Sequence, residues 1–156
     1  MKFSDFKPIA PHWIAGFTDG DGSFSIKITK RINTSFCPLD KKDRQVELRF
    51  RITQHIRDAH LLGAIAEYLG CGKVYTRSNK LACLLTRSVG QLQVSNFPDN
   101  LNKIMPFFKK YPLRTAKEKD FKDFCTVADY IKDSQHLTPE GLALIIELKS
   151  NMNNLR

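Results

Sequence analysis

Apolar and polar residues alternate strictly in two neighbouring stretches of the chain. In residues 22–31 and 45–53 every second position is apolar, namely Phe24, Ile26 and Ile28 in the first stretch and Val46, Leu48, Phe50 and Ile52 in the second. A period of two residues predicts a strand with one buried face. The segment 33–44 between them is polar and contains Pro38, which predicts a loop.

Two helices are predicted from apolar residues at helical spacing in the first half of the chain. The opening helix runs from Pro11, a type tolerated at the first helical position, to about Gly20. Asp58 is expected to cap the second, and Gly70 to close it. Its apolar face consists of Leu61, Leu62, Ile65, Ala66 and Leu69.

The rest of the chain predicts further strands and then helices. Residues 73–96 favour strands, with turns at Ser78-Asn79 and Val89-Gly90. Three later helices begin near Asn96, Thr115 and Thr138. Their expected inner faces are Leu101, Ile104, Met105 and Phe108, then Phe121, Phe124, Cys125 and Ala128, and finally Leu142, Ile145, Ile146 and Met152.

This order of elements predicts an α+β fold of one domain, residues 1–156, with an antiparallel sheet covered by helices on one face. The other face would carry Lys27, Arg31, Arg49 and Arg51. A solvated sheet face is one interpretation of that pattern. The other is a basic ribbon that fits the major groove of DNA.

The charge of the chain favours the second interpretation. Lys and Arg number 25 against 16 Asp and Glu, a formal net charge of +9, with a pI near 9.5. Such an excess indicates a polyanionic partner, nucleic acid before a membrane surface. No stretch is long enough to cross a bilayer and the N-terminus lacks a signal-like apolar region, so we expect an intracellular protein. The cysteines and histidines lack the spacing of a zinc site, a disulfide framework or an HNH-type nuclease.

The segment 14–22, IAGFTDGDG, is unusual for a helix. Gly16 and Gly20 each cost a helix about 1 kcal/mol relative to Ala. Glycines four residues apart share one face and allow a second helix to approach closely. Asp21 lies at the helix C-terminus, where a negative charge is unfavourable unless a cation joins it. The segment therefore predicts paired helices that bring acids together around a hard divalent metal.

These residues resemble the LAGLIDADG signature of homing endonucleases. Other stretches of the chain fit the same family in the same order: Ser23-Phe24, 52–54, 106–113, 115–121 and 137–153. The resemblance covers nearly the whole chain. It implies an αββαββα fold with a saddle-shaped antiparallel sheet and helices on one face.

The resemblance also implies a function and an assembly. It implies a site-specific endonuclease that cuts both strands of a long, near-palindromic DNA site and leaves short 3′ overhangs. Such proteins are encoded within introns, often of organelles (mitochondria or chloroplasts) or of microbes, and neither a membrane nor a small-molecule substrate is expected. A single motif implies a homodimer, with Ile14, Gly16, Phe17, Asp19 and Gly20 at its interface. The alternatives are an intron maturase that binds RNA, and a DNA-binding protein of the same fold that does not cut.

The resemblance assigns the chemistry to a few residues. Asp21 and the carbonyl of Gly20 are expected to bind Mg²⁺, a site that Mn²⁺ or Ca²⁺ also fits. Gln54 matches a position that orients water near the metal. Lys117 matches a basic position near the scissile phosphate, for which Arg114 competes. Some relatives carry a further basic residue where this chain has Asp58, with Arg57 beside it.

The outward residues of the strands are the expected DNA contacts. Arginine pairs well with guanine and asparagine with adenine, while other contacts reach only phosphates. The set is Ser25, Lys27, Thr29, Arg31, Asn33, Glu47, Arg49, Arg51, Tyr75, Arg77 and Asn79.

Overall fold

The computed structural model describes residues 9–30, 44–77 and 88–152. Two helices and four strands occupy the first two thirds: α1 (Pro11–Asp21), β1 (Gly22–Lys30), β2 (Arg44–His55), α2 (Ala59–Leu69), β3 (Lys73–Arg77) and β4 (Val89–Val94). Short turns of helix, α3 (Phe97–Asp99), η3 (Asn100–Ile104) and α4 (Met105–Lys110), lead to the long helices α5 (Lys117–Lys132) and α6 (Pro139–Asn151). Single 3-10 turns, η2 (Ile56–Asp58) and η4 (Gln135–Leu137), precede α2 and α6.

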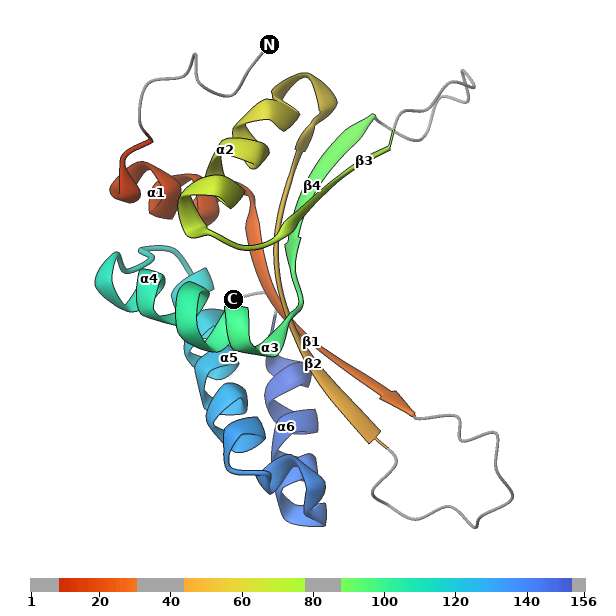
Figure 1. The fold of residues 1–156 in the computed structure, drawn as a ribbon. Helices are drawn as coiled ribbons and strands as arrows, with labels where there is room; N and C mark the ends of the chain where they lie inside the picture. The colour runs from red at the N-terminus through yellow and green to blue at the C-terminus, as the bar shows by residue number, and fades with distance from the viewer. Residues whose placement is uncertain (1–8, 31–43, 78–87, 153–156) are drawn as a thin grey trace.

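The four strands form one antiparallel sheet in the order β1-β2-β4-β3. Figure 1 shows all helices on one side of this sheet, whose opposite side curves open. Helix α5 packs on β1 and β2, and α2 packs on β3 and β4. The α+β class, the antiparallel sheet and its single helical layer are confirmed.

The core lies between the sheet and the helices and is built around aromatic rings. Phe24 of β1 has no exposed surface, and its ring lies 5.1–5.5 Å from those of Phe50, Phe108, Phe121 and Phe124. Ring pairs at such distances add favourable contacts beyond the burial of apolar area. The inward residues predicted from the period of two are therefore the ones that attach the helices to the sheet.

Two features of the predicted pattern are wrong. Val89-Gly90 begins β4 and is no turn. A Cβ atom on Gly90 would lie 2.9 Å from Cβ of Ala59, so this glycine allows α2 to pack closely on the strand. Ile146 was expected in the core, but 42% of it is exposed because only Ile145 of that pair faces inward.

The predicted helix caps are only partly confirmed. Thr138 Oγ1 accepts a hydrogen bond from the Gly141 amide at 3.0 Å, and Asn96 Oδ1 accepts one from the Asp99 amide at 3.1 Å. Asp58 precedes α2 as expected, but its side chain makes no capping bond. Its carboxylate pairs instead with Arg57 Nε at 3.3 Å.

Strand β2 is longer than its neighbour β4, and this leaves a fork in the sheet. Residues 44–49 of β2 pair only with β1, because the pairing with β4 begins at Phe50. The buried Asn100 donates to the carbonyl of Leu48 at 3.0 Å and to that of Val94 at 3.4 Å. One amide thus binds two carbonyls where the strands part. The predicted turn at Ser78-Asn79 and most of the predicted loop, 33–43, lie outside the described residues.

Candidate metal site and nucleic-acid interface

The C-terminus of α1 brings together the predicted site residues. Asp21 is exposed at the last position of the helix, and Gln54 Nε2 donates a hydrogen bond to its Oδ2. The two residues are neighbours because Gly22 pairs with Ile52 in the sheet. A Cβ atom on Gly22 would lie 2.7 Å from the carbonyl oxygen of Thr18, so the direct passage from helix to strand requires glycine there.

Lys117, at the start of α5, reaches the same helix end. Its ammonium donates to the carbonyls of Thr18, Asp19 and Gly20 at 3.3, 2.8 and 2.7 Å. Helix C-termini carry unpaired carbonyls and the negative end of the dipole, so a cation is favoured there. The structure thus places Lys117 at the carbonyl that the resemblance assigns to metal binding.

Asp19 fixes this arrangement from within the chain. Its carboxylate accepts bonds from the amides of Arg114 and Thr115 at 2.9 and 3.1 Å, and from Thr115 Oγ1 at 2.7 Å. Thr115 Oγ1 in turn accepts from the Lys117 amide at 3.3 Å, although the N-cap position of α5 is Ala116 and not Thr115. Asp19 therefore ties the start of α5 to α1 and sets the position of Lys117.

The oxygen atoms at this helix end fit a hard divalent cation. A carboxylate, a backbone carbonyl and an amide are the ligands that Mg²⁺ and Ca²⁺ prefer. The ammonium already seated among the carbonyls shows that positive charge is favoured there. Within the described residues, no group of three or more His, Cys, Asp and Glu could hold a metal. At the end of α1, the exposed carboxylate in this set is that of Asp21.

The outward face of α1 is open. Trp13, Gly16, Phe17 and Gly20 lie along it at helical spacing, and Trp13 is 43% exposed and stacks on Phe17 with ring centroids 4.8 Å apart. A Cβ atom on Gly16 or Gly20 would meet nothing within 4 Å. Nothing in the described part of the chain therefore requires these glycines, and the face has room for a second helix.

The predicted interface changes in one residue and gains another. Ile14 was placed at the interface, but it is fully buried in the core of its own chain. The orientation of α1 explains this position, because its buried side faces the core and consists of Ile14, Ala15 and Thr18. Trp13 was missed, although its spacing of three and four residues from Gly16 and Phe17 places it on their face.

The outward face of the sheet carries the predicted DNA contacts that fall in the described residues. Residues that pair directly across antiparallel strands share a face. Ser25 lies opposite Arg49, Lys27 opposite Glu47, and Arg51 opposite Gln93. Thr29, Tyr75 and Arg77 belong to the same face, whereas Arg31, Asn33 and Asn79 lie outside the described residues.

Further polar residues share this face and were not predicted. The register places Gln91 between Thr53 and Tyr75, and Gln93 between Arg51 and Lys73. Gln91 Nε2 also donates to Thr53 Oγ1 at 3.0 Å. The alternation of buried and polar residues in β4 indicates that Gln91 and Gln93 face outward, but the prediction of a turn at residues 89–90 hides this pattern.

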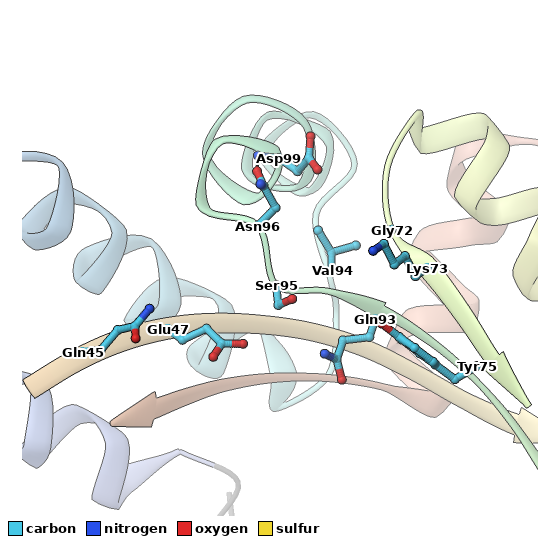
Figure 2. Close-up of a pocket in the computed structure, with 10 residues that line it drawn as sticks. All are labelled: Gln45, Glu47, Gly72, Lys73, Tyr75, Gln93, Val94, Ser95, Asn96 and Asp99. Atoms are coloured by element: carbon cyan, nitrogen blue, oxygen red, sulfur yellow. Dashed lines mark hydrogen bonds between the residues drawn. The ribbon is translucent and has the colours of Figure 1, made fainter. Parts of the chain in front are cut away.

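A polar hollow of about 600 Å³ lies beside the fork of the sheet, where β4 ends and β2 continues (Figure 2). Outward side chains of three strands contribute to it, including Glu47, Tyr75 and Gln93. The remaining lining comes from Gln45, Gly72, Lys73, Val94, Ser95, Asn96 and Asp99. Its amides, hydroxyls and charged groups are of the kind that contact base edges and phosphates.

Two further observations concern the rest of the chain. Cys71 and Cys125 are free thiols, and burial raises the pKa of each to about 11, so they are unreactive at neutral pH. None of the described helices has the length and apolar character needed to span a membrane.

The fold and the site thus define a class of protein. Its members have a curved sheet with an open cationic face, joined to a helix whose C-terminal oxygens can bind a cation. Within that class, the chain belongs to the LAGLIDADG endonuclease family, whose model matches residues 14–128.

Individual relatives agree with this assignment. "Probable intron-encoded endonuclease 3" of Neurospora crassa is 34% identical over 85% of the chain, and "Probable intron-encoded endonuclease 2" of the same fungus is 31% identical over 93%. The chain spans only 22% and 28% of these two relatives, about a quarter of their length.

Solved structures show the same fold. The homing endonuclease I-TnaI superimposes with a TM-score of 0.79 at 32% identity, over 96% of this chain and 92% of its own. The meganuclease I-SmaMI, bound to uncleaveable DNA, gives 0.80 at 38% identity, over 94% of this chain and 46% of its own.

Proposed function

We propose that this chain forms half of a site-specific, divalent-metal-dependent endonuclease that cuts double-stranded DNA. The observation that carries the proposal is the position of Asp21. Its exposed carboxylate lies at the end of α1, held by Gln54, where the cationic face of the sheet begins. The names of the relatives and the DNA in the I-SmaMI structure support the same activity.

The metal would be held by Asp21 and the carbonyl of Gly20, and Mg²⁺ is the proposed ion. A divalent cation bound there supplies Lewis-acid chemistry: it activates water and stabilises charge on a phosphate oxygen. The chain's own residues do the rest. Gln54 orients the Asp21 carboxylate, and Lys117 brings a positive charge that can stabilise the phosphate as its charge increases.

The second half of the site is proposed to come from a second copy of the chain. The sequence contains one copy of the motif, and one carboxylate is too few for a metal site. Gly16, Phe17, Asp19 and Gly20, with Trp13, would form the interface, because a two-fold axis lets the same helix face meet itself. Sedimentation should give twice the 17.9 kDa chain mass, and a monomer at all concentrations would refute this assembly.

The proposed DNA-binding surface is formed by the outward residues of the sheet named above. The target is expected to be long and near-palindromic, because two copies of one reading surface would lie on it. Cleavage is proposed to leave short 3′ overhangs. An organellar location is proposed as well, and it is supported by relatives that are named as intron-encoded proteins of fungi.

The activity is tested by cleavage of a pool of duplexes that span the insertion points of the relatives' introns. We expect Mg²⁺-dependent cutting by the wild type and a loss of more than about 10³-fold in Asp21→Asn, since the metal ligand is removed. Asp133→Asn, which changes another exposed acid at a helix C-terminus, is the matched control and should cut normally. Equal cutting by Asp21→Asn would refute the site, and RNA binding without any cutting would favour a maturase.

A further inference from the structure

Glu47 is an unexpected residue on a surface proposed to bind DNA. Among the described strand residues that face outward, it is the only acid, and it shares this face with Lys27, Arg49, Arg51 and Lys73. A carboxylate there repels phosphates and weakens binding that does not depend on sequence. An acid at this position therefore calls for a role other than general affinity.

Glu47 is held by its neighbour on the same strand face. Arg49 Nε donates to Glu47 Oε1 at 2.6 Å, and Arg49 Nη2 donates to Oε2 at 3.2 Å. Both carboxylate oxygens thus bind one side of one guanidinium. The side chains of Arg49 and Glu47 are only 23% and 26% exposed, so the pair is better shielded from solvent than an ordinary surface ion pair.

This pairing leaves a defined part of Arg49 available. A guanidinium has five N–H groups in a planar fork, and Glu47 uses those on its Nε side. The N–H groups of Nη1, and the second one of Nη2, stay directed away from Glu47. Two such groups are what an arginine needs to bind O6 and N7 of guanine together. An arginine fixed in advance also loses less rotamer entropy when it binds.

We propose that Glu47 is a positioning residue that fixes the Arg49 guanidinium for one guanine, and so sets the base preference at one position in each half of the target. This role rests on the proposed DNA-binding function. A competing role, in which Glu47 itself accepts a hydrogen bond from cytosine, requires a carboxylate directed at the DNA. The observed pairing directs both of its oxygens at Arg49 instead.

The first test is selection of bound duplexes from a randomised pool in Ca²⁺, the ion present in an I-SmaMI structure with uncleaved DNA. The variants are Glu47→Gln, Arg49→Lys, both together, and Glu67→Gln, a control that removes an exposed acid from α2. We expect Glu47→Gln to lower the preference for guanine at one position about tenfold, which is the discrimination that one well-made base contact supplies. Its affinity for random DNA should not fall. Arg49→Lys should affect the same position, and the double variant should lose no more.

Several results would overturn the proposal. If Glu47→Gln alters a position that Arg49→Lys leaves unchanged, Glu47 contacts a base itself. A uniform loss of affinity across all sequences, or the same effect from Glu67→Gln, would also refute it. If the wild type selects no sequence, the proposed DNA-binding function fails and this role fails with it.

The second test needs no DNA. The Nε–H of Arg49, bonded to Glu47, should exchange slowly with solvent in nitrogen-15 NMR spectra of the free protein. We expect exchange at least about tenfold faster in Glu47→Gln and no change in Glu67→Gln. Unchanged exchange in Glu47→Gln would show that the carboxylate does not hold the guanidinium, and would refute the proposal even if DNA binding is normal.

Discussion

Helices α1 and α2 both have eleven residues and pack on the same side of the sheet, yet their C-termini are closed in opposite ways. Helix α2 ends in Gly70, whose left-handed backbone (φ 66°) lets the amides of Gly70 and Cys71 bind the carbonyls of Glu67 and Ala66. This is a Schellman closure, made by the local backbone alone. Helix α1 has no such closure, and Lys117 binds its last carbonyls from a distant part of the chain.

The two helix ends also differ in what their lysines bind. Lys103 also reaches the end of α2, but it binds one carbonyl, that of Gly70, at 2.6 Å and pairs with Asp99 at 3.1 Å. Lys117 binds three carbonyls, and none of the ion pairs in the described residues includes it. The end of α1, beside Asp21, thus depends on a cation from a distant part of the chain, whereas the end of α2 is closed by its own backbone.

The largest difference between the two helix ends should appear when their lysines are replaced in turn. Lys117→Met should slow DNA cleavage about 10²-fold, because a charge near the reacting phosphate is lost. It should also destabilise the chain by about 1–3 kcal/mol, since the carbonyls lose a charged donor. Lys103→Met should leave single-turnover cleavage rates within about twofold. Equal losses of cleavage in both variants would remove the distinction between the two helix ends.

A glycine on the open face of α1 should affect assembly more than folding. Gly16→Ala should stabilise the isolated chain by about 1 kcal/mol, because alanine favours a helix and nothing in the chain opposes its Cβ atom. The same methyl group should keep two copies of α1 apart and raise the dimer dissociation constant at least about tenfold. Sedimentation and urea unfolding measure the two effects. Weaker folding with unchanged association would contradict the proposed helix pairing.

The glycine that closes α2 should behave in the opposite way. Gly70→Ala should destabilise the chain by about 1–2 kcal/mol, since alanine is strained at a φ of 66°. DNA cleavage at a temperature where the variant is folded should be unchanged, because this helix end contributes none of the residues proposed for the metal site. Thermal unfolding gives the first value and single-turnover kinetics the second. A stable variant would mean that the local closure contributes little.

The smallest effect is a dependence of stability on pH at the end of α2. Burial raises the pKa of Cys71 from 9.0 to about 11. Below pH 9 the thiol is protonated in both the folded and the unfolded chain, so its titration takes nothing from the free energy of unfolding. Between pH 9 and 11 the unfolded chain releases this proton while the folded chain keeps it, and stability is lost as the pH rises. The difference in urea midpoint between wild type and Cys71→Ala should therefore shift against the wild type across this range.

The parts of the fold that follow a simple period could be predicted from the sequence. Alternation along β1 and β2 identified the inward residues, because each strand has one buried and one open face. The caps at Asn96 and Thr138 followed from local chemistry. The motif and the later matches also singled out Asp21, Gln54 and Lys117, which the structure brings together at the end of α1.

Other features depend on contacts between distant residues and could not be predicted. Helix α1 is apolar on two faces, so its sequence did not show that Ile14 faces inward while Trp13 faces outward. Gly90 resembled a turn residue, because the contact that favours glycine there, the close approach of Ala59, comes from another element. The pairing of Glu47 with Arg49 depends on rotamers that a strand pattern does not determine.

The fork in the sheet has a consequence for how such a protein can change over time. Asp21 and Gln54 lie at one end of the β1–β2 pair, and residues 44–49 extend from the other end with pairing on one side only. Asn100 holds the sheet at the point between them. Substitutions at the outward positions of this ribbon, such as Glu47 and Arg49, therefore leave the buried Leu48 and its bond to Asn100 in place. An endonuclease of the proposed kind can thus acquire a new target sequence through these outward residues, while Asp21 and Gln54 stay unchanged.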